Sequence, residues 1–297
     1  MNHVARNPGT TPLLPRAFTL RPLGREDTPF GLRLSHSAGW NQTEADWKLI
    51  VDQGSAGNLV ACIDGVDVGT VTVITYAERF HWLGMLLVAP EFRRRGIGRA
   101  LLKSALDRVD DGCPVFLDAT PAGKELYDRS GFQEVYGLRR CLRHPASLGI
   151  TPVDPCQPIT DAGLPAVVDY DEPIFGANRS WILTELLHRA PQLAFYAQQD
   201  RKLAGYCLGR VGHRYTQVGP LAADDQVVAR DLLLAVLLHH SQDEVILDAP
   251  FHQPAWNQLL QDLGFEEQRP FMHMALGECR LPEEHVKQLA IAGPEWG

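Results

Sequence analysis

One arrangement of residues occurs twice along this chain of 297 residues. In each copy a proline follows a short apolar run, and an Asp-Ala pair comes 28 residues later, from Pro90 to Asp118 and from Pro220 to Asp248. A Gly-Phe pair then closes each copy, at Gly131-Phe132 and Gly264-Phe265. Equal separations across stretches that include loops indicate an internal duplication. The sequence therefore predicts two copies of one domain in tandem.

The elements expected within the first copy alternate between strands and helices. Apolar, β-branched runs predict strands at 59–63, 68–74 and 83–88, and apolar residues at helical spacing predict a helix over 100–109. This pattern predicts an α/β (α+β) fold in which each domain is a twisted mixed sheet flanked by helices. Four prolines between 145 and 158 interrupt regular structure. We therefore expect a flexible N-terminal arm at 1–16, a first domain at 17–144, a linker at 145–158 and a second domain at 159–297.

The strongest chemical signal is the basic, glycine-bearing loop that follows the strand at 83–88. Gly96 and Gly98 have no side chains, so an anion can approach the main chain where a helix begins. The first N–H groups of a helix have no partner within it, and the helix dipole places about half a positive charge at that end. Arginines on both sides add fixed charge. The sequence thus predicts a pyrophosphate site made by Arg93, Arg94, Arg95, Gly96, Ile97, Gly98 and Arg99.

This loop resembles motif A of the GNAT superfamily of acyl-CoA-dependent N-acyltransferases. That motif has Gln or Arg, then Gly three residues later, then Gly or Ala two residues after it, and Arg93, Gly96 and Gly98 hold these positions. The second family motif resembles 120–132, with Thr120 at the usual asparagine position and Leu126-Tyr127 in a short helix. The resemblance covers 18–141 well and the second half more distantly. It implies acetyl-CoA as cosubstrate, lying near Thr120 and Tyr127, with its pantetheine amides paired to the main chain of Leu86, Leu87 and Val88.

The second copy lacks the residues of the pyrophosphate loop. With Pro220 aligned on Pro90, Arg93 corresponds to Ala223, Gly96 to Gln226 and Gly98 to Val228. Asp224 and Asp225 would repel a pyrophosphate. The chain therefore resembles bacterial tandem GNAT proteins with a degenerate C-terminal domain, which we expect to cover the first domain's cleft and to help select the acceptor.

Acetyl transfer to an amine requires a deprotonated nitrogen and benefits from a proton for the leaving thiolate. Tyr127 is the expected general acid, since a phenol is protonated at neutral pH and the resemblance places it near the cofactor sulfur. Many relatives carry a glutamate on the strand before motif A, but 83–88 contains no carboxylate. Glu78 and His81 are the nearest titratable candidates for the base, and a chain of water molecules is the alternative.

The acceptor pocket is expected partly in the first two helices. Trp40 and Asn41 lie there, with Trp40 as an aromatic wall. In the second half Asp171 could face an ammonium, although a core role for Trp40 and a solvated acidic turn at Asp171 remain open alternatives.

Composition limits the function classes. The formal net charge of −8 and a pI of about 5.7 argue against nucleic-acid and anionic-membrane partners. We expect a cytoplasmic monomer or homodimer with no metal, because no histidine or cysteine set has zinc spacing. The predicted function is direct transfer of acetyl from acetyl-CoA to a primary amine of a small molecule in a ternary complex. A non-catalytic acyl-CoA sensor or scaffold and a protein or peptide lysine acetyltransferase are the alternatives.

Overall fold

The computed structural model describes residues 18–109, 112–146, 156–240 and 242–297. The predicted arm at 1–16 and most of the predicted linker therefore lie outside the described residues. The first half follows the expected alternation of strands and helices. Its elements are β1 (Phe18–Pro22), α1 (Thr28–Ser37), α2 (Glu44–Asp52), β2 (Leu59–Ile63), β3 (Val66–Tyr76), β4 (Phe80–Val88), α3 (Ile97–Leu106), β5 (Val115–Ala119), α4 (Pro121–Asp128) and β6 (Gln133–Arg143).

The second half repeats much of this order. Its elements are β7 (Gln157–Pro158), α5 (Leu164–Phe175), α6 (Ser180–Arg189), β8 (Phe195–Gln199), β9 (Lys202–Val211), β10 (Thr216–Ala223), α7 (Gln226–His239), β11 (Val245–Pro250), α8 (Pro254–Asp262), β12 (Phe265–Leu276) and a short β13 (Gln288–Ala290). Short 3-10 turns at 25–27, 90–92, 191–193 and 285–287 join some of these elements. Among the described residues, no helix is both long and apolar enough to cross a membrane.

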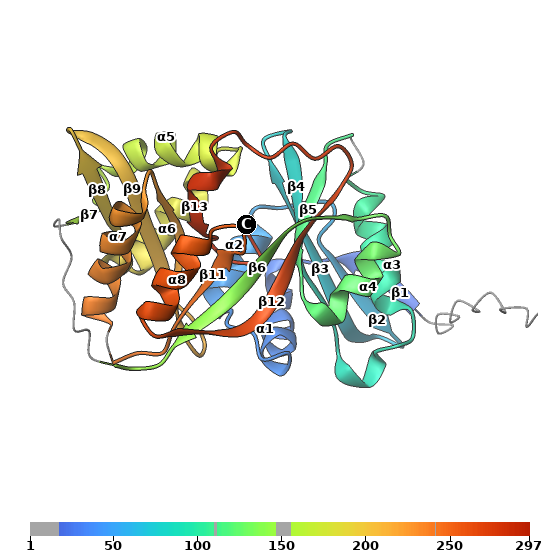
Figure 1. The fold of residues 1–297 in the computed structure, drawn as a ribbon. Coiled ribbons are helices and arrows are strands. Elements are labelled where there is room, and N and C mark those ends of the chain that lie inside the picture. Colours follow the sequence, from blue (N-terminus) through green and yellow to red (C-terminus); the bar gives the residue numbers. More distant parts are fainter. Residues whose placement is uncertain (1–17, 110–111, 147–155, 241) are drawn as a thin grey trace, which may run out of the picture.

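The two halves share one mixed sheet, because they exchange their last long strands. The strand order is β1-β2-β3-β4-β5-β12-β6-β11-β10-β9-β8-β7, with β13 paired to β10. Thus β12 of the second half pairs with β5 of the first, and β6 of the first half pairs with β11 of the second. In Figure 1 these two strands run together across the middle of the molecule. The tandem arrangement agrees with the prediction, but the two halves share one sheet instead of forming a separate sheet each. The strand pattern of the sequence does not specify which half supplies the neighbouring strand, so this sharing was not predictable from it.

Helices cover both faces of the shared sheet. In the first half α3 packs its apolar face, including Ile97, Leu101 and Ala105, on one side, together with Tyr127 of α4. Residues of α1, α2, α5 and α6 form one core on the other side. The first and second halves are therefore in direct apolar contact on the face of the sheet that α1, α2, α5 and α6 cover.

A buried ionic network also joins the halves. Asp46 of α2 accepts hydrogen bonds from Arg210 of β9 and from Arg189 of α6, the latter at 2.9 Å. Arg210 also donates to Glu295 at 2.5 Å, near the end of the chain. All but Arg189 are almost fully buried. Because the network satisfies several buried charges at once, it fixes the position of the last residues against both halves.

Candidate active site between two diverging strands

β4 and β5 diverge in the middle of the shared sheet. They pair in parallel at His81 and Trp82 of β4, opposite Val115 and Phe116 of β5. Beyond this point the register between β3 and β4 shifts, and Met85 has a φ of 46°. The hydroxyl of Thr70 donates to the Met85 carbonyl at 2.9 Å and holds this bulge. A bulge turns main-chain groups away from the ladder, so 83–86 faces a gap beside β5.

The basic loop connects the end of β4 at Val88 to the start of α3 at Ile97. Gly96 precedes the first turn of α3 with a φ of 80°, in the left-handed region that glycine adopts without strain. A Cβ added to Gly98 would meet only Leu126 at 3.7 Å and Val88 at 3.9 Å, which is ordinary contact. Packing within the protein thus does not require glycine at 98. The bare main chain leaves room for a ligand that approaches the start of α3.

The arginines of the loop are exposed. Arg93 donates from Nε to the Val88 carbonyl at 2.9 Å and joins the loop to the end of β4. Arg95 lies over the Phe92 ring, 5.3 Å from its centroid. Positive charge and unpaired helix N–H groups therefore converge on one exposed site, which fits the pyrophosphate of coenzyme A.

A small cavity of about 80 Å³ occupies the gap between β4 and β5. Main-chain and side-chain atoms of 83–86 line one wall, and Thr120, Gly123 and Tyr127 line another. The Thr120 hydroxyl accepts from the Gly123 N–H at 3.3 Å and caps α4, which carries Tyr127. Burial raises the pKa of Tyr127, so its phenol is protonated at neutral pH and can donate.

Two carboxylates that the sequence analysis did not single out also line this cavity. The side chains of Asp118 of β5 and Glu295 are both buried, and one oxygen of each has no hydrogen-bond partner among the described residues. Burial raises the pKa of Glu295, against the opposing charge of Arg210. Glu295 approaches β4 because Gly84 has no side chain; a Cβ there would lie 3.2 Å from the Glu295 carbonyl oxygen. The glycine in β4 was the one sequence signal for this close approach.

The structure does not bring the two predicted base candidates into this cavity. His81 is buried at the paired end of β4, with Nδ1 3.0 Å from Thr75 Oγ1. Glu78 is exposed in a turn and has a φ of 58°. Neither residue lines the cavity that contains Tyr127.

The predicted acceptor residues lie in three different environments. Trp40 lines the small cavity beside Gln42. Asn41 is buried and accepts from the main-chain N–H groups of Arg214 and Tyr215 at 2.9 and 3.0 Å, so its amide joins the two halves. Asp171 is buried in an ion pair with Arg179 at 2.8 Å and lines neither this cavity nor the larger one described below. Of the three, only Trp40 contributes to the wall around Tyr127.

The corresponding gap in the second half is filled by the chain itself. β13 pairs with β10 at Leu221 and Ala222, and the next N–H, of Ile291, donates to the Asp248 carbonyl of β11 at 3.1 Å. The Asp225 carboxylate accepts from the N–H groups of Val227 and Val228 at 2.8 and 2.9 Å, which occupies the start of α7. The Val228 hydrogen bond is the largest of the causes that hold the pKa of Asp225 below its ordinary value.

Strand pairing corrects one detail of the sequence alignment. Thr216 lies opposite Val245 as His81 lies opposite Val115, so Pro220 corresponds to Met85 at the bulge rather than to Pro90. The residue before the helix, Gly96 in the first half, is therefore Asp225 in the second. The connection into α7 is shorter than the basic loop. The sequence alignment thus predicted the absence of the basic loop in the right region of the second half, but it compared residues that are not structurally equivalent.

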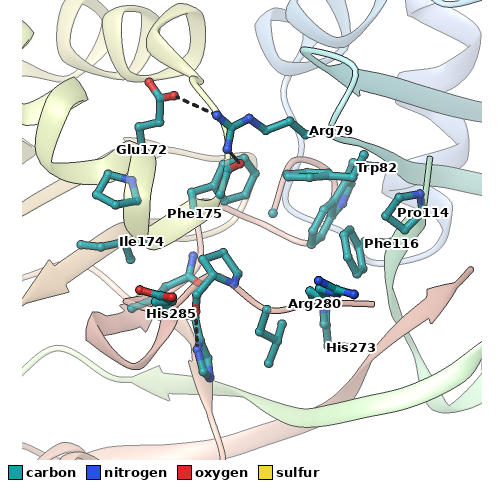
Figure 2. Close-up of a pocket in the computed structure, with 18 of the residues that line it drawn as sticks. Arg79, Trp82, Pro114, Phe116, Glu172, Ile174, Phe175, His273, Arg280 and His285 are labelled. Atoms are coloured by element: carbon teal, nitrogen blue, oxygen red, sulfur yellow. Dashed lines mark hydrogen bonds and ion pairs between the residues drawn. The ribbon is translucent and has the colours of Figure 1, made fainter. Parts of the chain in front are cut away.

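A larger cavity of about 880 Å³ lies between the halves (Figure 2). Its aromatic side includes Trp82, Phe116 and Phe175, and His273 of β12 lies beside Phe116. Its rim carries Glu172, which pairs with Arg79 at 3.8 Å. Residues 291–297 separate this cavity from the small one, since Ile291 and Gly297 line the larger cavity whereas Pro294 and Glu295 line the smaller. No group of three or more His, Cys, Asp or Glu in the described ranges could hold a metal ion.

Comparison with known proteins gives the same result from both halves of the chain. Two family models described as acetyltransferase (GNAT) domains match residues 55–134 and 167–290. The chain is 25% identical to an uncharacterized N-acetyltransferase, YitH, of Bacillus subtilis over 80% of this chain and 83% of that one. It is 26% identical to holothin acyltransferase of a Pseudoalteromonas species over 95% of each chain.

Solved structures show the same fold. A structure from Pyrococcus horikoshii, described as an acetyltransferase, has a TM-score of 0.75 at 21% identity over 99% of this chain and all of that one. A tandem GNAT protein from the clavulanic acid biosynthesis pathway has a TM-score of 0.63 at 15% identity, over 89% of this chain and all of that one.

Proposed function

Because this chain belongs to the GNAT family of N-acetyltransferases and has two GNAT domains in tandem, we propose that it transfers acetyl from acetyl-coenzyme A to a primary amine of a small molecule. The transfer takes place in a ternary complex at the gap between β4 and β5. The second domain positions the acceptor and binds no cosubstrate. The observation that carries this proposal is that the bulged strand β4 and Tyr127 border one cavity, and that β4 leads directly into the basic loop before α3.

The residues present fit acetyl-coenzyme A. The start of α3, with Gly96 and Gly98, would hold the pyrophosphate, and the main chain of Leu86 to Val88 would pair with the pantetheine amides. When bound there, the cosubstrate supplies an activated acetyl group. Main-chain N–H groups at the bulge stabilise the negative charge that develops on the thioester oxygen, and Tyr127 donates its proton to the leaving thiolate.

Two observations favour a small acceptor over a lysine of a folded protein. The small cavity is bordered by both halves of the chain, including Trp40, Arg269 and Glu295, so an acceptor has to fit against both halves. A relative of almost the same length is named for holothin rather than for a protein acceptor. Acetylation of a protein lysine in preference to every small amine tested would contradict this part of the proposal.

The cosubstrate site is tested by isothermal titration of the full chain with coenzyme A. Gly96→Glu places a carboxylate where the pyrophosphate would bind and should abolish the heat of binding. Gln226→Glu places the same carboxylate at the start of α7 in the second half and should leave the affinity unchanged. Melting temperatures of both variants serve as the folding control. Equal loss of binding in the two variants, or no loss in Gly96→Glu, would overturn the assignment.

A further inference from the structure

The duplicated aspartates at the ends of β5 and β11 have different partners. Asp248 lies opposite Arg140 in the β11–β6 pair, and Asp118 lies opposite His273 in the β12–β5 pair. Arg140 and His273 are equivalent, since each stands eight residues after the phenylalanine of its Gly-Phe pair. Each exchanged strand thus places a side chain against the aspartate of the other half. Asp248 of the second half faces an arginine, and Asp118 of the first half faces a histidine.

The arginine pair is fully satisfied. Arg140 donates from Nε and NH2 to the two oxygens of Asp248, both at 2.8 Å, and Gln217 donates to one of these oxygens at 3.3 Å. Both side chains are buried. A bidentate pair of this kind occupies both carboxylate oxygens and leaves little capacity for another partner. Unlike Asp118, Asp248 lines neither of the two cavities described above.

The histidine pair leaves capacity for a ligand. Asp118 Oδ1 lies 2.8 Å from His273 Nδ1, and the Asp118 side chain is fully buried. No residue in the described part of the chain hydrogen-bonds its other oxygen, Oδ2, and Asp118 lines the small cavity with Tyr127. Burial raises the pKa of Asp118, while the hydrogen bond to His273 opposes this effect. A buried carboxylate oxygen without a partner is costly unless a donor from a ligand satisfies it.

We propose that Asp118 is the catalytic residue that takes the proton from the acceptor's ammonium, and that His273 is the positioning residue that holds it. This inference rests on the proposed function, and it supplies the carboxylate base that residues 83–88 of β4 do not contain. His273 stacks with Phe116 at 5.4 Å and Tyr136 at 4.6 Å between ring centroids, so the ring is fixed in orientation. With its Nδ1–H directed at Oδ1, the histidine leaves Oδ2 directed to the substrate.

The proton balance of the reaction is then complete. Asp118 Oδ2 takes one proton from the ammonium, and the freed nitrogen lone pair forms the C–N bond. The C–S bond breaks with its electrons on sulfur. Tyr127 protonates that sulfur and is itself reprotonated by the second proton of the nitrogen. Asp118 releases its proton to water after the amide leaves, so one proton is released for each acetyl transferred.

Glu295 is the competing carboxylate in the same cavity. Its Oε1 accepts from Arg210, which also binds Asp46 in the network that joins the halves. The permanent charge of Arg210 opposes the effect of burial and lowers the proton affinity of the Glu295 carboxylate. The geometry therefore favours Asp118, and a direct comparison of the two residues decides between them.

The test measures thiol release from acetyl-CoA with two acceptors at neutral pH. One is the primary alkylamine that the wild-type chain acetylates fastest, which is almost entirely protonated. The other is hydroxylamine, which is largely unprotonated and needs no base. Asp118→Asn should lower kcat by about 100-fold or more for the alkylamine and by less than about tenfold for hydroxylamine, as expected for loss of a general base. His273→Leu should reproduce part of this selective loss of alkylamine activity. His273→Asn keeps an N–H donor and should restore the alkylamine activity.

Asp248→Asn is the matched control. It is the same substitution at the equivalent residue, so it should lower the melting temperature while leaving the ratio of the two acceptor rates as in the wild type. Equal loss with both acceptors in Asp118→Asn would show a structural role and overturn the proposal. A selective loss in Glu295→Gln instead of Asp118→Asn would overturn it as well.

A second measurement needs no turnover. In ¹⁵N-histidine NMR spectra, His273 should be the Nδ1–H tautomer at neutral pH in the wild-type chain and should lose this preference in Asp118→Asn. An Nε2–H tautomer in the wild type would contradict the pair. A chain that binds coenzyme A but acetylates no amine would contradict the proposed function, and the tautomer would then decide the geometry of the pair by itself.

Discussion

At the scale of single residues, Tyr127 shows how one side chain distinguishes the two halves. It stands five residues before Phe132, and the equivalent residue before Phe265 is Leu260. Both side chains are buried, so either serves as a core residue, but only the phenol has a proton to give. The residue proposed as the proton donor in one half is thus replaced by a purely apolar one in the other.

Tyr127→Phe should lower kcat by about 10- to 100-fold, because the ring still packs on Phe132 while the proton donor is lost. The dissociation constant for coenzyme A should change by less than about threefold. Steady-state kinetics and calorimetry on the same preparation check this result. An unchanged kcat would require another acid.

The residues that sequence reasoning found and missed differ in how local their signal is. Gly96, Gly98 and Tyr127 belong to short motifs, in which spacing along the chain fixes position in space. Asp118 gains its role from His273, which is 155 positions away and reaches it only through strand exchange. No pattern within either segment reports such a contact. Asn41 illustrates the reverse case, since its polar side chain next to a tryptophan suggested a binding site and instead satisfies main-chain groups across the two halves.

At the scale of elements, the start of α3 is kept open for a ligand rather than by packing. Gly98→Val should leave the free energy of unfolding within about 1 kcal/mol, because a Cβ there makes only ordinary contacts and glycine is a poor helix residue. It should weaken coenzyme A binding by about tenfold or more, since the branched side chain projects toward the bound pyrophosphate. Urea denaturation and calorimetry measure the two effects, and unchanged affinity would place the pyrophosphate elsewhere.

The order of elements was predictable, whereas their pairing was not. Strands and helices of the first half lie within a few residues of their predicted positions, because apolar periodicity and turn residues are local signals. The exchange of β6 and β12 depends on which of two similar neighbours each strand meets, and both choices would bury the same apolar face. The pairing that the fold adopts creates the aspartate–histidine and aspartate–arginine contacts.

At the scale of the whole molecule, the shared sheet and the buried network around Arg210 make the halves one cooperative unit. Leu101→Ala in the first half and Leu234→Ala in the second each remove a fully buried side chain. Each should lower the free energy of unfolding by about 2–5 kcal/mol. Both should shift the same single calorimetric transition. Two transitions, of which each variant moves only one, would show that the halves unfold independently.

Each half has a groove where its middle strands diverge, and the short β13 occupies the groove of the second half. The two grooves therefore differ in the ligand concentration that would be needed to fill them. A segment tethered to its own groove competes with a free ligand at an effective concentration in the millimolar range, and it does so in every copy of the chain. An acyl-CoA would have to displace covalently attached main chain to enter the second groove, whereas the proposed function has it enter the first by simple association. The proposed function therefore predicts saturation at one cosubstrate per chain, however much cosubstrate is supplied.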